Sequence, residues 1–231
     1  MLVYGPEFAG SDRQSLRLNP GFYLRWDRIS IATRGGFRSA SEPGERGGLR
    51  IDLSPSERWR INVGLRYDLG RQESSSGQLM GMGNIPSTLR VRTSATYKLW
   101  DGWSAGATAV FDALGRGGGW QGDAHLGREL RFSPDTTWSL GAALAYAGDR
   151  HMQTYFGVTD EQSLRSGYPV YTPPAGMRDL SAAVNARTEL GGSWHMFYGG
   201  SAARLLGPAA ASPLTRQRDV WSANLGLVYR F

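Results

Sequence analysis

The sequence predicts an all-β protein: an antiparallel up-and-down transmembrane β-barrel of about twelve strands, with residues 1–231 forming a single domain. Three observations predict it. Apolar and polar residues alternate with a period of two, short turns alternate with long loops, and tryptophan recurs at one position in several strands. The chain has no run of about 18 apolar residues, which excludes a transmembrane helix, whereas a barrel strand needs only every second residue to be apolar.

The alternation defines the expected strands. It is clearest in residues 59–69, 89–99 and 221–231, where apolar side chains occupy every second position. Weaker runs cover residues 15–26, 28–37, 48–54, 103–112, 121–132, 137–147, 178–190 and 194–205. Residues Met1–Tyr4 add a first strand truncated to a stub, which makes twelve strands, an even number as such barrels require.

The connections are of two alternating kinds. Short turns are expected at 26–28, 54–57, 101–102, 133–135 and 191–192. Longer loops are expected at 5–14, 38–47, 70–87, 113–120, 148–177 and 206–218, of which 113–120 is rich in glycine and expected to be flexible. Outer-membrane barrels have short periplasmic turns and longer extracellular loops, so this layout predicts the Gram-negative outer membrane as the location.

Four tryptophans follow directly after tight turns: Trp59, Trp103, Trp138 and Trp194. In a barrel they would lie at one height, as an aromatic girdle at the periplasmic membrane interface. Tryptophan is also simply a good strand residue. The shared position in four strands favours the girdle.

The polar face of each strand is expected to line the barrel lumen, because a charged side chain facing lipid near the midplane costs about 2–4 kcal/mol. The predicted lumen charges are Arg60, Arg66, Arg90, Arg92, Lys98, Glu129, Arg131 and Arg187, interleaved with Asp52, Asp68 and Glu189. Arg128 is the exception, because it alternates in phase with Leu126 and Leu130. It indicates either a bulge or an arginine that extends to the membrane interface.

Composition limits the function. The net charge of +6 comes from scattered arginines, with Lys98 the only lysine, which argues against nucleic-acid binding. Without cysteine, a disulfide framework and a thiolate metal site are excluded. The three histidines have no metal-ligand spacing, so we expect no catalytic residues, metal or cofactor. No signal peptide precedes the first strand, which leads us to expect a truncated start.

Two further segments carry specific expectations. In the loop 148–177, Thr159 with Gln162 forms a capping-box pattern and Gly167 suits a helix C-terminus, which predicts a short helix over Asp160–Ser166. The loop either merely covers the barrel mouth or acts as a gate or docking surface. The last strand ends in Tyr229 and Phe231 and resembles the assembly signal that the barrel insertion machinery reads.

Several separated motifs resemble the MipA/OmpV family of outer-membrane proteins. They are Tyr155, Phe156, Gly157, Val158 and Thr159, followed by Gln162, Ser166, Gly167 and Tyr171, together with Pro6–Asp12 and Ser212–Pro213. The resemblance implies an outer-membrane barrel, in contact with outer-membrane lipid, that acts as a non-enzymatic scaffold of murein synthesis. Its partners would be a lytic transglycosylase and a penicillin-binding protein. OmpV-like relatives also suggest porins or adhesins.

Three alternatives remain from the sequence. The arginine-rich lumen predicts a narrow channel for small or anionic solutes. Asp149 and His151, at the outer end of a strand, could form the site of a barrel lipase or protease. A soluble β-sandwich is the alternative fold.

Overall fold

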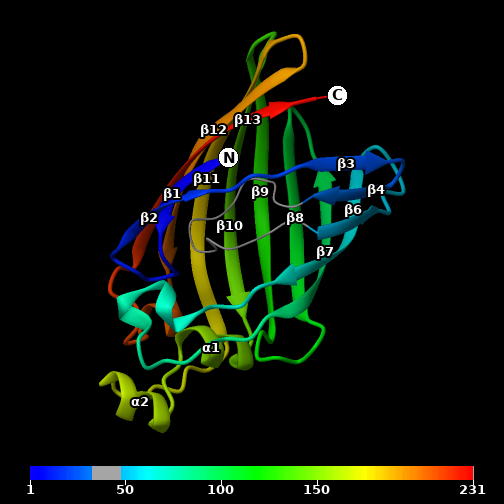
Figure 1. Ribbon diagram of the computed structural model, residues 1–231. Coiled ribbons are helices and arrows are strands. Elements are labelled where there is room, and N and C mark those ends of the chain that lie inside the picture. The colour runs from blue at the N-terminus through cyan, green and yellow to red at the C-terminus, as the bar shows by residue number, and fades with distance from the viewer. Residues whose placement is uncertain (33–47, 231) are drawn as a thin grey trace.

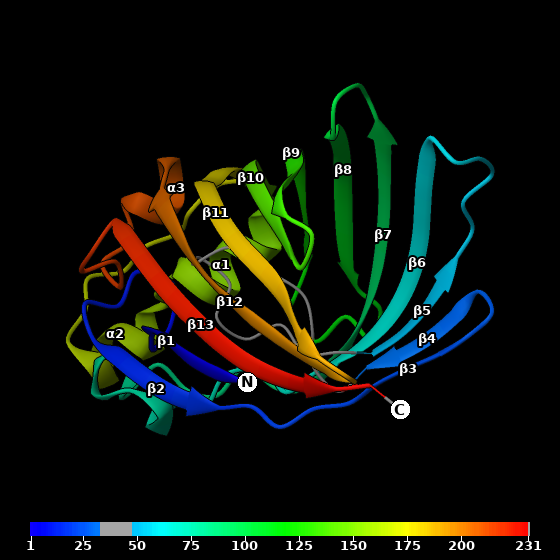
Figure 2. The same cartoon turned by 90° about the horizontal axis from the view of Figure 1, so that it is seen from above.

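The described residues, 1–32 and 48–230 of a computed structural model, form one antiparallel sheet of thirteen strands. The sheet is all-β and of the outer-membrane-barrel type, as the alternation predicts. It curves around a central space (Figure 1; Figure 2). The strands are β1 (Leu2–Pro6), β2 (Gln14–Leu18), β3 (Tyr23–Trp26), β4 (Ile29–Ala32), β5 (Gly48–Asp52), β6 (Trp59–Asp68), β7 (Thr88–Lys98), β8 (Trp103–Asp112), β9 (Trp120–Ser133), β10 (Thr136–Ala147), β11 (Gly176–Gly191), β12 (Trp194–Leu205) and β13 (Asp219–Tyr229).

One expected strand is divided in two, which explains thirteen strands where about twelve are predicted. Pairing between β2 and β1 continues to Asn19, whose N–H donates to the Met1 carbonyl oxygen at 2.7 Å. Pro20 follows and has no N–H to donate, so the strand expected over 15–26 is interrupted before β3. The expected strand 28–37 is observed as β4 up to Ala32, and its remainder and the loop 38–47 lie outside the described residues.

The two ends of the strand order are β2 and β3. They are consecutive in the chain and only residues 19–22 separate them. Among the described residues no hydrogen-bonded ladder joins these two edge strands. The covalent connection through residues 19–22 is what links the two edges of the sheet.

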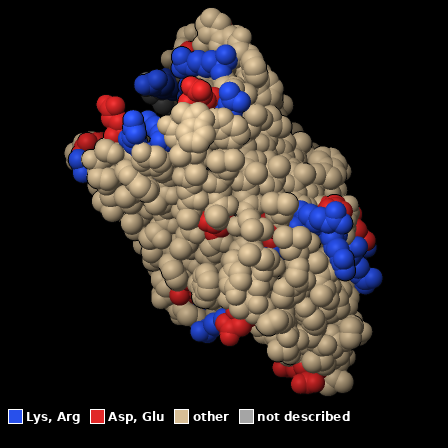
Figure 3. Space-filling model, turned by 180° about the vertical axis from the view of Figure 1, so that it is seen from behind, with Lys and Arg blue, Asp and Glu red and all other residues tan. Residues whose placement is uncertain are grey.

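The register determines which side chains share a face. In the pairing of β6 with β7, Arg66 lies opposite Arg90 and Asp68 opposite Thr88, all on the inner face. Leu65 and Tyr67 alternate with them on the outer face and are 42% and 52% exposed. Seen from behind, the outer surface has a broad area without charged side chains, and Lys, Arg, Asp and Glu gather mainly at its edges (Figure 3).

Short connections lie at one end of the sheet, which we call the tight-turn end, and long connections at the other, the loop end. The turn at Asp101 and Gly102 shows how the sequence makes the tight ones. Both residues have positive φ, 44° and 77°, and Trp103 N donates to the Trp100 carbonyl oxygen at 2.8 Å. Two consecutive positive φ angles define the type I′ turn, which matches the twist of a β-hairpin.

The helices all belong to the loop end: α1 (Asp149–Phe156), α2 (Asp160–Ser166), α3 (Gly207–Ala210) and the 3-10 turns η1 (Glu73–Ser75) and η2 (Gly77–Leu79). The helix α2 occupies the residues expected for it, with a capping box at Thr159 and Gln162 and Gly167 left-handed at φ 76°. Helix α1 is not among the elements expected from the sequence, and it lies across the space that the strands surround (Figure 2). No described helix is long and apolar enough to cross a membrane.

Two inner-face glycines allow a test of how tightly the wall is packed. A methyl group on Gly106 would lie 2.4 Å from the Ala95 carbonyl oxygen and 2.7 Å from His125 Nε2, whereas one on Gly141 would meet nothing closer than 3.7 Å. We expect Gly106→Ala to destabilise the folded protein by about 1–3 kcal/mol, as overpacking does. Urea unfolding in detergent micelles measures this, with Gly141→Ala as the control. Equal unfolding midpoints for both variants would contradict the packing described.

Candidate functional site

Helix α1 lies across the loop end of the barrel and closes it. One side of the helix makes apolar contacts, and the other makes polar contacts. On the apolar side, Met152 and Phe156 are 0% and 2% exposed and pack against Ala147, Leu205 and Ala209. The spacing of four residues puts both side chains on one face of the helix. Gly148, in extended conformation, is the single residue between the end of β10 at Ala147 and the start of α1, so the strand continues directly into the closing helix.

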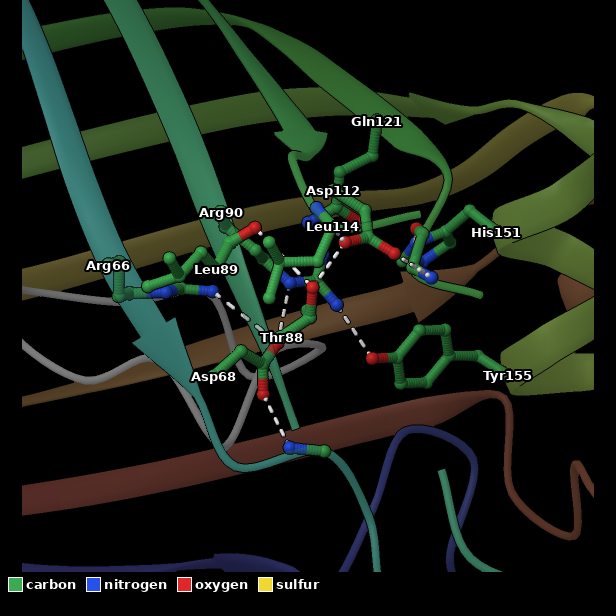
Figure 4. Close-up of polar contacts among 12 residues, drawn as sticks. Arg66, Asp68, Thr88, Leu89, Arg90, Asp112, Leu114, Gln121, His151 and Tyr155 are labelled. Atoms are coloured by element: carbon green, nitrogen blue, oxygen red, sulfur yellow. Dashed lines mark hydrogen bonds and ion pairs between the residues drawn. The ribbon is translucent and has the colours of Figure 1, made fainter. Parts of the chain in front are cut away.

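The polar side of α1 contacts one arginine of the wall, Arg90 in β7, and one of the loop 70–87, Arg71. Arg90 Nη2 donates to the Tyr155 hydroxyl at 2.6 Å, and Arg71 Nη1 donates to the Tyr155 carbonyl oxygen at 3.2 Å. Both guanidinium groups lie within 6 Å of the Tyr155 ring centroid, at 5.7 and 5.9 Å. Tyr155 is thus held from two sides, and Figure 4 shows its hydroxyl directed at Arg90.

Arg90 belongs to a network of ion pairs and hydrogen bonds that gives the charged side chains of the inner wall their partners. Arg90 Nε and Asp68 Oδ2 form an ion pair at 2.5 Å, and Arg66 lies 3.9 Å from the same carboxylate oxygen. The Asp112 carboxylate accepts from the Thr88 hydroxyl and from Gly118 N, the latter at 2.7 Å. We call Arg66, Asp68, Thr88, Arg90, Asp112 and Tyr155 the mouth cluster (Figure 4).

The glycine-rich loop 113–120, expected to be flexible, is instead bonded to α1. Three side chains of one helix face each donate to, or share a hydrogen bond with, a glycine carbonyl of this loop. The pairs are Arg150 with Gly115 at 2.6 Å, Thr154 with Gly117 at 2.5 Å, and His151 with Gly118 at 3.0 Å. A methyl group on Gly119 would lie 2.6 Å from His151 N, so a glycine at this position lets the loop backbone approach the helix this closely.

Burial changes the acidity of the second arginine that holds Tyr155. Removal from water lowers the pKa of Arg71 to about 10, and the nearby Tyr155 offsets a part of this shift. Arg71 therefore stays charged at neutral pH, and no carboxylate within the described part of the chain forms an ion pair with it. It belongs to the loop 70–87, where Arg71 and Ile85 form an isolated β-bridge.

The residues that carry the family resemblance converge at the loop end. Val158 forms a β-bridge with Tyr171, and Val158 packs with Met82 and Leu214. The Ser212 hydroxyl donates to the Phe156 carbonyl oxygen at 2.6 Å. The remaining contacts are Gln162 Nε2 to Met82 O at 2.7 Å, the Tyr171 hydroxyl to Pro208 O at 2.8 Å, the Ser11 hydroxyl to Gln78 Oε1 at 3.0 Å, and Ser166 to Gln162 O at 2.7 Å. Segments distant in sequence therefore build one closing layer.

Several of the expected lumen charges form ion pairs with one another in the structure. Arg66, Arg90 and Asp68 meet in the mouth cluster, and Arg187 lies 3.9 Å from Glu189 near the tight-turn end. By register, the others share the inner face without joining the mouth cluster: Asp52, Arg60, Arg92, Lys98, Glu129 and Arg131. Arg71, Arg178 and Asp179 were not anticipated. The last two form a buried ion pair at 2.6 Å, and Arg178 also donates to Gln121.

The four expected girdle tryptophans lie on the outer face at the tight-turn end, and each contacts one ring or cation there. Ring centroids are 5.0 Å apart for Trp59 and Tyr97, 5.8 Å for Trp138 and Tyr198, and 5.0 Å for Trp194 and Tyr229, and the Arg128 guanidinium is 5.3 Å from the Trp103 ring. Tyr229, expected in the assembly signal, thus ends β13 beside Trp194. Phe231 lies outside the described residues.

The structure argues against Asp149 and His151 as a catalytic pair. His151 is only 5% exposed, its Nδ1 shares a hydrogen bond with the Gly118 carbonyl, and its ring stacks on Tyr155 at 4.6 Å. Asp149 accepts from Arg150 N at the start of α1. The imidazole is therefore a buried part of the closing layer and is not open to a substrate.

A second polar chain crosses the inner wall. His125 Nδ1 lies 2.9 Å from Asp123 Oδ1, and His125 Nε2 lies 3.2 Å from the Thr96 hydroxyl. Carboxylate, imidazole and hydroxyl follow each other as in a hydrolase triad. However, Thr96 is inside β7, where backbone N–H groups are engaged with β6 and β8 and leave no oxyanion hole. We therefore interpret Asp123, His125 and Thr96 as a structural hydrogen-bond network of the inner wall.

The geometry permits charge recognition better than covalent chemistry. Among residues 1–32 and 48–230, no group of three or more histidines or carboxylates gathers as a metal site. Around α1, arginines outnumber carboxylates: Arg66, Arg71, Arg90 and Arg178 against Asp68, Asp112 and Asp179.

The Tyr155 hydroxyl bond should control how firmly α1 closes the mouth. Tyr155→Phe leaves the Arg90 guanidinium without this acceptor, and a hydrogen bond to a charged group contributes about 1.5–3 kcal/mol. We expect hydrogen exchange of the α1 amides to become roughly ten- to a hundredfold faster. The control is Tyr146→Phe, whose ring lies on the outer wall against Trp120. Unchanged exchange in α1 would show that the apolar contacts alone hold it.

The chain is similar to known protein structures and to a protein-family model. The chain is similar in structure to a NanC porin, with 8% identity over 100% of both chains and a TM-score of 0.43. It is also similar to a FadL homologue of Pseudomonas aeruginosa, with 14% identity over 100% of this chain and 76% of that one, and a TM-score of 0.42. No curated protein matches it. A family model described as "MltA-interacting protein MipA" matches residues 1–231, so the protein belongs to the MipA family.

Proposed function

We propose that the protein is a non-enzymatic barrel of the Gram-negative outer membrane that serves as a scaffold in murein synthesis. Its partners would be a lytic transglycosylase, as the family description suggests, and a penicillin-binding protein. The observation that carries the proposal is the closed mouth: α1 is held by apolar contacts and by two arginines on Tyr155. A barrel filled in this way is better suited to holding partners than to free passage of solutes.

The tight-turn end would be the periplasmic rim, where murein enzymes are accessible. Three neighbouring turns there, between β3 and β8, carry exposed arginines and tryptophans. Trp26 and Trp100 are 86% and 67% exposed, and Arg28 and Arg58 are also exposed. Aromatic and arginine side chains are enriched in protein interfaces, so this part of the rim is the surface that we assign to the partner.

Cross-linked affinity purification from outer membranes, read by mass spectrometry, tests the scaffold. We expect the wild-type protein to recover a lytic transglycosylase, and the double variant Arg28→Glu, Arg58→Glu to recover several-fold less because the sign of the rim charge is reversed. Arg218→Glu, which changes an exposed charge at the loop end, is the control. Heat-modifiable migration on gels verifies that each variant folds.

Two outcomes would contradict the scaffold. If the wild-type protein recovers only lipid and insertion machinery, no murein partner exists to be held. If the rim variant and the loop-end control lose the partner equally, the binding surface is elsewhere.

A narrow channel for small anionic solutes is the second candidate, favoured by the excess of arginine around the mouth cluster. Since α1 closes the loop end, we expect the wild-type protein to show little or no conductance in planar bilayers. Tyr155→Ala, which removes both arginine contacts of the side chain, should produce anion-selective openings. Steady anion-selective current through the wild-type protein would favour the channel over the scaffold.

A further inference from the structure

The outer wall has a groove that neither the family nor the closed mouth explains. It has a volume of about 600 Å³ and crosses β9 to β12. By register, Ala142, Ala182 and Ala202 lie side by side in one row of the outer face. Their small side chains form the hollow, and the larger outward residues Leu140 and Val184 border it toward the tight-turn end.

Arg128 lines the same groove and faces outward. The pairing of β9 with β8 is regular through Arg128 and Trp103, and the irregularity between β9 and β10 lies farther along, at Thr136 and Thr137. The outward orientation of the Arg128 side chain is therefore not caused by a β-bulge. Its side chain extends along the outer wall and its guanidinium lies over the Trp103 ring at 5.3 Å.

This arginine lacks an anion. Among the described residues it forms no hydrogen bond or ion pair, its guanidinium lies over the Trp103 ring, and its Nε is buried without a hydrogen-bond partner. The other outward arginine of this wall, Arg204, differs, because its Nε lies 3.6 Å from Asp219. A guanidinium group on an apolar wall without an acceptor is unfavourable, so a negatively charged partner from outside the chain that reaches its terminal nitrogens would stabilise Arg128.

We propose that the groove is a binding site for one anionic phospholipid. The phosphate lies on the Arg128 guanidinium beside Trp103, and an acyl chain occupies the hollow over Ala142, Ala182 and Ala202. The site suits an amphiphilic ligand, because a cation for the head group lies at one end of an apolar groove for the acyl chain. This cation is at the height of the interfacial tryptophans. The inference rests on the proposed position in the outer membrane, and it extends that proposal to lipid selection.

Native mass spectrometry of the protein released from detergent micelles tests the site, with phosphatidylglycerol and phosphatidylcholine as competing probes. We expect the wild-type protein to retain phosphatidylglycerol about tenfold more strongly. Arg128→Gln should abolish the preference, and Arg204→Gln, the matched outward arginine, should keep it. Ala182→Phe fills the groove and should weaken retention of both lipids.

Each other outcome would overturn the proposal. Equal retention of the two lipids by the wild-type protein, or an unchanged preference in Arg128→Gln, would remove the phosphate contact. A dimer that Ala182→Phe dissociates, without bound lipid, would identify the groove as an interface between two copies. Insertion into vesicles, followed by heat-modifiable migration, is measured on the same samples. Failure to insert refutes the outer-membrane position together with the lipid site, whereas insertion without lipid preference refutes the lipid site alone.

Discussion

Side chains alternate across a β-sheet, and this alternation connects the outer surface of the protein to its interior. A strand that turns Leu65 and Tyr67 outward must turn Arg66 and Asp68 inward, because shifting the register by one residue would exchange the two faces. An apolar outer wall therefore brings charged side chains into the barrel. Those charges need partners in a confined space, and the neighbouring strands supply some of them, as Asp68 does for Arg90. The structure of the mouth follows from this requirement.

Helix α1 supplies hydrogen-bond acceptors to arginine side chains that the neighbouring strands do not fully satisfy. Its hydroxyl at Tyr155 accepts from Arg90, and its carbonyl group at the same residue accepts from Arg71. The opposite face buries Met152 and Phe156, which contributes the apolar contact that a polar network alone does not provide. The closing helix is thus both a plug and a binding partner of the wall. Opening it would expose apolar side chains and deprive two arginines of their acceptors, so closure is the expected resting state.

The sequence predicted the wall far better than the mouth. Period-two alternation and type I′ turn residues such as Asp101 and Gly102 are local signals, and they identify strands, faces and turns without any long-range information. The interruption at Pro20 was also visible in the sequence, although the strand was expected to continue through it. The mouth depends on contacts between residues far apart: Arg71 and Arg90 belong to other segments than Tyr155. A local signal for α1 did exist, since His151 with Tyr155 and Met152 with Phe156 have helical spacing. It is only two turns long, and its N-cap residue Gly148 has no side chain to accept a hydrogen bond, whereas α2 has a capping box at Thr159 and Gln162.

Arg128 shows how a departure from the alternation can be more informative than agreement with it. The pattern alone leaves two explanations, a bulge or an arginine extended along the wall, and regular pairing through Arg128 supports the second. A cation on an apolar wall persists only if its environment compensates for it. Trp103 does so in part, through the face of its ring, and the groove beside it leaves room for an anionic amphiphile. The inner wall neutralises some of its charges with residues of the chain itself, as Asp68 does for Arg90, whereas Arg128 on the outer wall would depend on the membrane for the same purpose. On this view the lipid is the outer counterpart of α1, because each supplies an acceptor to an arginine of the wall from outside the sheet.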